Sequence, residues 1–309
     1  MWKYILKRIS YFIPTLFAIS ILVFTLVRLI PGDPVEIILG QRVTAELAEI
    51  FRTQLGLDQP IWVQYFIWLR NMLTGYWGRS LISGLDVSYL VFHRFRYTLA
   101  LSIFSMAIEI SVGLLLGIIA AYKAGSRLDR GLRFITIFGW SLPSFLVGIV
   151  LIYIFALQLR WFPPLGAGDI SHLILPGLTL AVGGVTYISR MTRGSMLEVA
   201  GQDFVRTAKA KGLKKRRIML KHVMRNALLP IVTMLGISFG GSLSGAFIVE
   251  TIFSYPGIGY LAVQSVSTRD YAVVQGCVIL IAIIYCTTNL VVDILYVYLD
   301  PRVRYERRV

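Results

Sequence analysis

The chain contains six apolar segments, each about as long as a helix that crosses a membrane. They cover residues 9–30, 98–122, 133–158, 173–190, 228–250 and 274–299. About twenty apolar residues are needed to cross the roughly 30 Å of hydrocarbon in a bilayer. Only 15% of the 309 residues are charged, whereas soluble domains carry about 25%. The sequence therefore predicts an all-α integral membrane protein with six transmembrane helices.

Two of the apolar segments contain residues that disturb helices. Segment 173–190 is the shortest and holds Gly183 and Gly184, so we expect a break there. Segment 133–158 contains Pro143, which should kink the third span. Glycine pairs four residues apart predict close helix packing, either within the chain or at a sliding interface with a second membrane subunit. These pairs are Gly113–Gly117, Gly236–Gly240 and Gly241–Gly245.

The basic residues predict the orientation of the chain. With a cytoplasmic N-terminus, 22 of the 31 lysines and arginines fall in four inner segments, residues 1–8, 123–133, 190–225 and 300–309. Basic residues accumulate in cytoplasmic loops, so we expect both termini to be cytoplasmic (N-in, C-in). The same bias explains the net charge of +15 without nucleic acid, because no basic stripe interleaved with aromatic residues is present.

Four regions follow from this arrangement of segments. Residues 1–30 form the N-terminus and first transmembrane helix, and residues 31–97 form an extracytoplasmic segment. Residues 98–299 form a transmembrane core of five spans, which includes a cytoplasmic loop at 191–227, and residues 300–309 form a cytoplasmic tail. The extracytoplasmic segment has helical apolar spacing and predicts two short helices, the first between Thr44 and Gly56. Its Trp and Tyr residues indicate either interfacial anchoring or a cover over a pore mouth.

The loop between the fourth and fifth spans is strongly basic. Residues 207–230 carry eight lysines and arginines and no acid. One helical stripe precedes Gly212 and consists of Phe204, Val205 and Ala208. A second stripe faces away from the basic run 214–217 and consists of Ile218, Met219, His222 and Val223. Gly212 suits the left-handed turn that ends a helix. Two short amphipathic helices are predicted, and spacing alone leaves anionic lipid and a protein as equal alternatives for what they contact.

Three acidic residues lie in or at the ends of the spans, namely Glu109, Glu250 and Asp293. Such acids usually face protein or a water-filled cavity. They either hold the structure through hydrogen bonds or line a translocation pathway, and the second interpretation makes them candidate pathway residues. The three histidines, His93, His172 and His222, are scattered, so no metal site is predicted. The motif HExxH is absent and no pair of catalytic acids is evident, so no catalytic residue is predicted.

Nine motifs in one order carry a resemblance to a known family. The loop contains "DFVRTAKAKGL" and then "RRIMLKHVMRNALLPIV". The others are "RLIPGDP", "LGLDQP", "YWGRS", "SLPSF", "HLILPGLTL", "ETIFSYPGIGYLAVQSV", "RDYAVVQG" and "LVVDILYVYLDPRVRY". Together they resemble permease subunits of binding-protein-dependent ABC importers, in the dipeptide, oligopeptide and nickel branch. The wider family has Glu-Ala-Ala, three residues and Gly in the loop, of which only Ala208 and Gly212 match. The form Arg206-Thr207-Ala208 is common in this branch.

The resemblance implies a function and a set of partners. The chain would form the translocation pathway for short peptides, or alternatively for nickel complexes or glutathione-like solutes. It would lie in a bacterial-type cytoplasmic (inner) membrane as a multi-pass protein. Its partners would be a second homologous permease subunit, two ATP-binding subunits and an extracytoplasmic substrate-binding protein. The residues that would couple it to the ATPases are Asp203, Phe204, Val205, Arg206, Thr207, Ala208, Lys209, Ala210, Lys211 and Gly212.

No ATPase motif of the form GxxxxGK[ST] occurs in the chain. We therefore expect a transport subunit without its own enzymatic activity or cofactor, with ATP and Mg bound by its partners. An ion-coupled secondary transporter is the remote alternative. It would predict matching interrupted spans in two halves, and none is evident.

Overall fold

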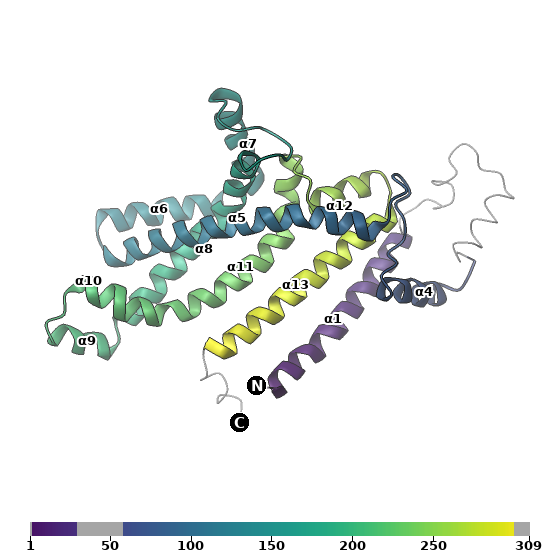
Figure 1. Cartoon of the computed structure of the whole chain (residues 1–309). Helices are drawn as coiled ribbons and strands as arrows, with labels where there is room; N and C mark the ends of the chain where they lie inside the picture. Colours follow the sequence, from purple (N-terminus) through teal and green to yellow (C-terminus); the bar gives the residue numbers. More distant parts are fainter. Residues whose placement is uncertain (1, 30–57, 300–309) are drawn as a thin grey trace. The chain divides into compact units, whose positions relative to one another are not determined.

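The structure is a computed structural model of the whole chain, and it describes residues 2–29 and 58–299. Every regular element in these residues is a helix, apart from an isolated bridge between Arg79 and Asp86. Figure 1 shows these helices in the order of the chain. The prediction of an all-α protein is confirmed.

The chain divides into two compact units. The first comprises residues 1–95 and 261–283, and the second comprises residues 96–260 and 284–309. Helices α5 (Val87–Tyr122), α12 (Ile258–Ser267) and α13 (Tyr271–Leu299) each contribute residues to both units.

In the first unit, α4 (Ile61–Leu73) packs against α1 (Trp2–Leu29). The hydroxyl groups of Tyr65 and Ser20 share a hydrogen bond of 2.7 Å, and both side chains are buried. Helix α4 is the second of the two short helices predicted for the extracytoplasmic segment. The first, between Thr44 and Gly56, lies outside the described residues.

In the second unit, α8 (Ser171–Ala200) packs against α6 (Arg127–Ser141), α7 (Ser144–Leu151) and α11 (Met224–Ile252). Helix α5 approaches α8 through two glycines. A Cβ atom added to Gly113 would contact Ile188, and one added to Gly117 would contact Thr192, at distances that real side chains avoid. The prediction of close packing at this glycine pair is confirmed, with the neighbour inside the same chain.

The second glycine pair packs in the same way at Gly236, where an added Cβ atom would overlap Val292 of α13. At Gly240 the nearest neighbour, Thr288, is at an ordinary contact distance of 3.4 Å, and Gly241 faces open space. Close packing therefore depends on which side of the helix a glycine occupies, and spacing alone does not report it.

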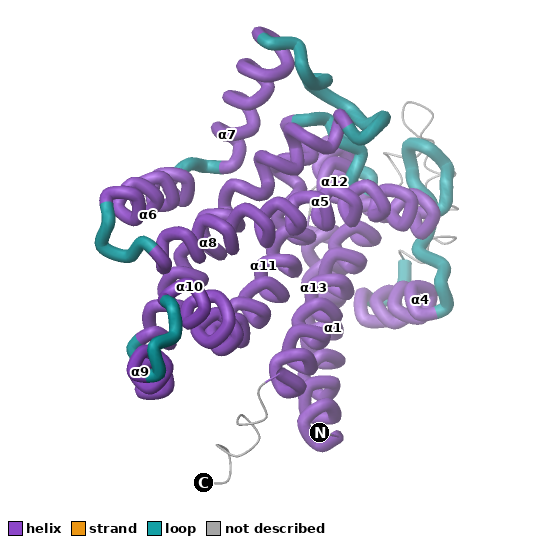
Figure 2. The backbone as a smooth tube through the Cα atoms, turned by 60° about the vertical axis from the view of Figure 1, so that its left-hand side comes forward, coloured by secondary structure: helices purple, strands orange, loops and turns teal. Residues whose placement is uncertain are grey.

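The third predicted span is sharply bent at Pro143. Helix α6 ends at Ser141, and α7 begins at Ser144 and continues as a wider helix, η2 (Ile152–Gln158). The two halves meet at an angle of 101°, and Figure 2 shows α7 turning away from α6. This bend confirms the predicted kink. Its cause is that proline lacks the backbone N–H donor that would continue the helix.

The predicted break at Gly183 and Gly184 is wrong. Both residues lie inside α8, which runs without interruption over 30 residues. A glycine in a helix costs only about 1 kcal/mol relative to alanine, which packing against three other helices readily outweighs. The helix is also longer than the predicted segment, because it continues past residue 190 for ten residues.

Four described helices are long and apolar enough to cross a membrane, and they are α1, α5, α8 and α13. The bent α6–α7–η2 segment is a fifth if it forms one span. Helix α11 has 29 residues and covers the fifth predicted segment. The length and composition of these helices fit the prediction of a multi-pass helical membrane protein. The count of six spans, the orientation and the region boundaries stay predictions.

A buried apolar core lies where α5, η2, α8 and α11 meet in the second unit. Its main members are Leu101, Ala156, Leu175, Ala246, Val249, Phe253 and Tyr255. A separate core supports the basic loop and belongs to the site described next.

Candidate functional site

The basic loop folds as a helical projection, here named the basic protrusion and defined as residues 203–223. It begins with α9 (Asp203–Ala210), continues through a turn at Gly212 and α10 (Lys215–Arg217), and ends with the wider helix η3 (Ile218–Val223). Figure 1 shows α9 and α10 at the ends of α8 and α11. The predicted short helix before Gly212 is confirmed. The second predicted segment is helical but is not a separate short helix, because α10, η3 and α11 (Met224–Ile252) follow one another without a break.

The turn after α9 has the geometry that glycine favours. Gly212 has φ +75°, a left-handed conformation that costs other residues roughly 1–2 kcal/mol. The Gly212 N–H donates to the Lys209 carbonyl at 2.9 Å, and the Leu213 N–H donates to the Ala208 carbonyl at 3.3 Å. This pair of bonds is the Schellman arrangement that ends a helix. It confirms the predicted role of Gly212.

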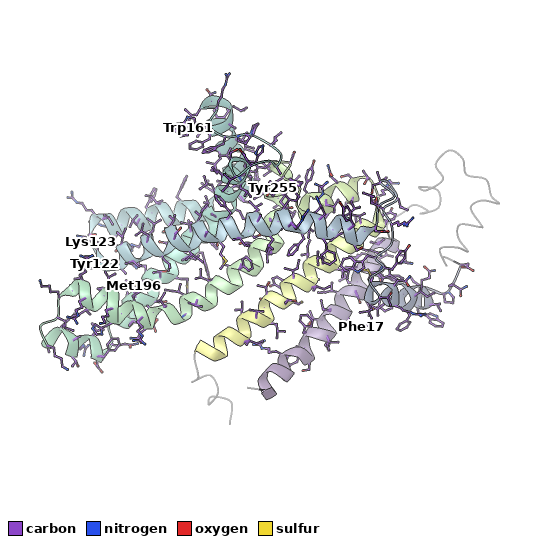
Figure 3. All side chains as sticks on the ribbon, viewed as in Figure 1. Phe17, Tyr122, Lys123, Trp161, Met196 and Tyr255 are labelled. Carbon is purple, nitrogen blue, oxygen red and sulfur yellow. The ribbon has the colours of Figure 1, made fainter. Side chains whose placement is uncertain are left out.

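The basic protrusion has its own hydrophobic core, here named the protrusion core. It joins the two halves of the protrusion to α5, α8 and α11. Its buried members are Ala121, Met196, Val199, Val205, Ala208, Ile218, Met219, Val223 and Ala227. Met196 lies on α8 at this end of the second unit, where Tyr122 and Lys123 of the α5 end are also labelled in Figure 3. An eight-residue helix is marginal alone, so this core is what holds α9 in place.

Three of the four residues of the predicted second stripe are buried, and the fourth, His222, is only partly buried and lies outside the protrusion core. Ile218, Met219 and Val223 are buried in the protrusion core, whereas the basic run 214–217 is exposed. The side-chain ammonium of Lys215 lies 5.0 Å from the centre of the Tyr122 ring. Such a cation over an aromatic face is attracted by the electrons of the ring.

The first stripe differs from the prediction at Phe204. Val205 is 1% exposed and Ala208 is buried, but the Phe204 side chain is 38% exposed. The protrusion core includes Val205 and Ala208 of α9 but not Phe204. Phe204 therefore adds an exposed apolar group to α9, on which Arg206 and Lys209 are also exposed.

Glu109 lies among three helices of the second unit. Its carboxylate accepts hydrogen bonds from Ser105 at 3.0 Å and from Ser238 of α11 at 3.1 Å. A Cβ atom added to Gly184 of α8 would overlap this carboxylate. The side chain is 2% exposed. This placement favours the structural interpretation in the observed arrangement, and a pathway role for Glu109 stays a prediction.

Glu250 caps the start of α12. Its carboxylate accepts a hydrogen bond from the Thr98 hydroxyl at 2.6 Å and one from the Tyr260 N–H at 3.1 Å. The Thr98 hydroxyl in turn accepts the Ile258 N–H at 2.9 Å. The first N–H groups of a helix have no partner within it, and here a buried acid from another helix supplies one. The glycines of the 257–259 turn leave room for this carboxylate.

The side chain of Asp293 lies outside the described side chains, so its pathway role stays a prediction. Among the described residues, no three His, Cys, Asp or Glu side chains are grouped in a way that could hold a metal ion.

Sequence reasoning missed two buried acids, Asp270 and, near the start of α6, Asp129. The Asp129 side chain is fully buried and accepts two hydrogen bonds from Arg193. A signal was available in Ser126, since a serine three residues before an acid is typical of a helix start. Ser126 does accept the Asp129 N–H at 3.2 Å. The long-range partner Arg193 carries no such local signal.

The comparisons with known proteins decide the family. Residues 113–305 match the family described as binding-protein-dependent transport system inner membrane component, and residues 1–102 match its N-terminal companion family. The chain belongs to this family. The permease is therefore a multi-pass inner-membrane transport subunit of an ABC importer and not its ATPase. It acts in a membrane complex with ATP-hydrolysing and substrate-binding subunits.

Two relatives match the permease over almost its whole length. It is 40% identical over 313 residues to the probable peptide ABC transporter permease protein y4tP of Sinorhizobium fredii, covering 99% of this chain and 100% of the relative. It is 42% identical over 306 residues to the glutathione transport system permease protein GsiC of Escherichia coli K12, with the same coverage.

Solved structures share the fold of the permease. The methionine ABC transporter MetNI, in an inward-facing form, matches with a TM-score of 0.59 at 18% identity, covering 69% of this chain and 97% of that chain. An amino acid ABC transporter matches with a TM-score of 0.51 at 20% identity, covering 70% and 94%. At these identities the likeness shows the fold alone.

Proposed function

We propose that the permease carries short peptides across the inner membrane, and that α9 is the helix through which an ATPase subunit drives it. The observation that carries the substrate class is whole-length identity of 40% and 42% to permeases named for a peptide and for glutathione. Glutathione is itself a tripeptide, so both names point to small peptidic solutes. Glutathione is the second candidate within this class.

The architecture of the basic protrusion supports the docking role of α9. The inner face of the helix is held by the protrusion core, and its outer face exposes Phe204, Arg206 and Lys209. A docking helix has to transmit force, so it must be rigidly attached on one side and free to contact a partner on the other. Switching by rigid-body motion requires such an element. Residues Asp203 to Gly212 meet both conditions.

The remaining partners follow from the same proposal. The permease has no phosphate-binding loop motif, so ATP and Mg are bound by separate subunits. We propose two such ATPase subunits. A second homologous permease completes the pathway, and an extracytoplasmic binding protein delivers the substrate. The protein is surrounded by lipid and needs no nucleic acid or cofactor of its own. Closure of the ATPases on nucleotide then pulls each α9 and tilts the spans between inward-open and outward-open states.

Uptake by the reconstituted complex tests the substrate class. Proteoliposomes that contain both permeases, both ATPases and external binding protein are supplied with labelled di- and tripeptides, glutathione or a nickel chelate. We expect ATP-dependent uptake of peptides, with unlabelled peptide competing. Uptake of the nickel chelate alone would contradict the peptide proposal, and uptake of glutathione without other peptides would select the second candidate.

Cross-linking tests the docking role separately from the substrate. A cysteine at Lys209 lies on the outer face of α9, and it should cross-link to an ATPase subunit in the assembled complex. Ala208→Glu places a charge in the protrusion core and Gly212→Pro disrupts the turn, so both should abolish the cross-link and uptake. Gly194→Ala, on an exposed side of α8 with no atom near the added methyl group, is the matched control. Uptake that persists in both variants would contradict the docking role.

A further inference from the structure

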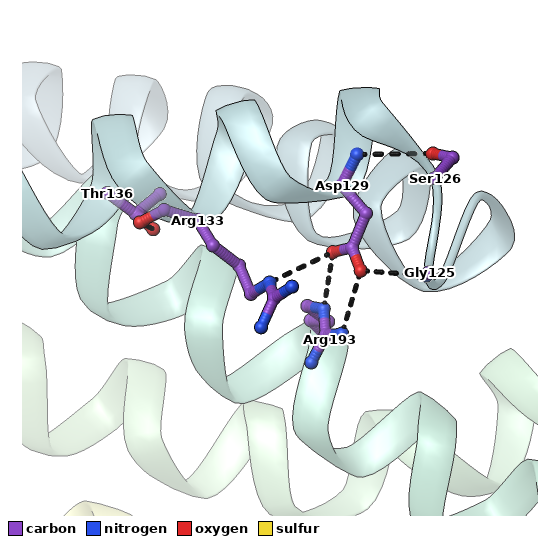
Figure 4. A network of polar contacts seen from close by, with 6 residues as sticks. All are labelled: Gly125, Ser126, Asp129, Arg133, Thr136 and Arg193. Atoms are coloured by element: carbon purple, nitrogen blue, oxygen red, sulfur yellow. Dashed lines mark hydrogen bonds and ion pairs between the residues drawn. The ribbon is translucent and has the colours of Figure 1, made fainter.

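Asp129 attaches the start of α6 to α8 through a bidentate ion pair with Arg193. The Arg193 Nε donates to Asp129 Oδ1 at 2.7 Å, and the Arg193 NH2 group donates to Oδ2 at 2.9 Å. The Gly125 N–H also donates to Oδ2, at 3.0 Å. Figure 4 shows these bonds converging on one carboxylate. The Asp129 side chain is fully buried and that of Arg193 is 23% exposed. A bidentate arginine–carboxylate pair fixes orientation as well as distance.

Arg133 makes a much weaker contact with the same carboxylate. Its Nε lies 3.6 Å from Asp129 Oδ1, and its side chain is 47% exposed. An exposed, loosely placed cation contributes little to an ion pair. The carboxylate is therefore held mainly by Arg193, and Arg133 serves as an internal comparison.

Arg193 lies next to the part of α8 that supports the basic protrusion. Met196, one helical turn further along α8, is fully buried in the protrusion core together with Val205 of α9. Helix α8 thus carries, within three residues, one contact that holds α9 and one that holds α6. Because the backbone of α8 is continuous through this region, displacement of α9 should displace the Arg193 side chain with it.

Helix α6 is fastened to α8 at its other end as well. The Trp140 and Tyr187 rings stack with centres 5.8 Å apart, and a Cβ atom added to Gly139 would press on Thr186. Immediately beyond this contact the chain bends by 101° into α7. With both ends attached, α6 can follow α8 as one body, whereas release of the Asp129 end would leave it anchored only near the bend.

We propose that Asp129 and Arg193 are positioning residues that make α6 move together with α8 and α9, so that ATP-driven displacement of α9 reaches the bend between α6 and α7. This inference rests on the proposed docking of an ATPase on α9. Breaking one side of a buried ion pair leaves an uncompensated charge, so single substitutions should release the Asp129 end of α6 from α8. The expected phenotype is ATP hydrolysis that no longer produces transport.

The first test measures uptake per ATP hydrolysed in the reconstituted complex. Asp129→Asn and Arg193→Gln should lower this ratio by about tenfold, within the range seen for residues that couple distant sites. Arg193→Lys keeps the charge but not the two-pronged geometry and should be intermediate. Arg133→Gln should match the native complex. If the pair only stabilises the fold, uptake and hydrolysis fall together with the amount of assembled complex, the ratio stays constant, and the proposal is wrong.

The second test follows α6 and α9 directly with spin labels. Cysteines replace Arg130 on α6 and Gln202 just before α9, both exposed, in a chain from which Cys277 and Cys286 have been removed. In the native complex, the distance between the labels should stay the same when ATP and vanadate trap the closed ATPases. In Arg193→Gln it should change or broaden. A change in the native complex would overturn the proposal.

The two tests separate this inference from the docking proposal. If α9 does not dock an ATPase, the Lys209 cross-link fails in the native complex and the ratio measurement loses its basis. If docking is correct and the inference is wrong, the cross-link forms normally while Arg193→Gln retains the native ratio and label distance.

Discussion

Substitution of Val205 by alanine should weaken the attachment of α9 to the rest of the permease. Val205 is 1% exposed and contacts the protrusion core, which is the main attachment of this eight-residue helix. Removing two buried carbon atoms costs about 0.8 kcal/mol each, and the cavity left behind raises the total to about 2 kcal/mol. Because each 1.4 kcal/mol corresponds to a factor of ten, the undocked population of α9 should rise about 30-fold.

Hydrogen exchange measures this change directly. Amides that exchange through local opening report the free energy of that opening. In Val205→Ala, the backbone amides of residues 206–210 should exchange about 30-fold faster, while those in the middle of α13 should be unchanged. Proteolysis after Lys209 and Lys211 should increase in parallel, since cleavage follows the open population when opening is rapid.

Phe204→Ala is the matched control, because it removes a larger apolar side chain from the neighbouring position. Phe204 is 38% exposed and is not among the residues of the protrusion core, so its loss should change exchange in α9 by less than about threefold. Equal effects from the two substitutions, or no effect from Val205→Ala, would refute the argument that burial in the protrusion core holds α9.

Three further predictions concern single positions. Gly212→Ala should destabilise the basic protrusion by about 1 kcal/mol through its left-handed backbone alone, because no atom lies near the added methyl group; Gly212→Asn should recover most of this in the same exchange assay. Thr98→Val removes the hydroxyl that bonds both Glu250 and the Ile258 N–H and should cost about 1–3 kcal/mol in thermal unfolding, whereas Thr98→Ser should be near native. Gly184→Ala should cost about 1–3 kcal/mol, because its methyl group would overlap the Glu109 carboxylate. Gly183 faces open space, so Gly183→Ala should be neutral or slightly stabilising. Equal melting temperatures for the two alanine variants would contradict the packing described for Glu109.

Much of the site was predictable from the sequence because its signals are local. The alternation of apolar and basic residues places Ile218, Met219 and Val223 inside and the run 214–217 outside, and a helix period of 3.6 residues is enough to see it. The left-handed turn at Gly212 and the bend at Pro143 depend on the backbone chemistry of single residues. The family motifs added the proposal that α9 docks an ATPase, which periodicity alone could not distinguish from lipid contact.

Other features depend on partners distant in the chain, and only the tertiary structure decided them. Asp129 is bonded to Arg193, which is 64 residues further along the chain, and Thr98 is bonded to Glu250, which is 152 residues further along. The residues next to either acid do not indicate which distant residue it bonds. Gly184 resembles a helix breaker in the sequence, yet it is where α8 makes room for Glu109, and Phe204 shares a stripe with Val205 but misses the core. The sequence by itself determined which segments are helical, apolar or basic, because those properties belong to short stretches of chain. The tertiary structure determined which buried charges are paired and which glycines are required, because both depend on atoms that other helices bring into contact.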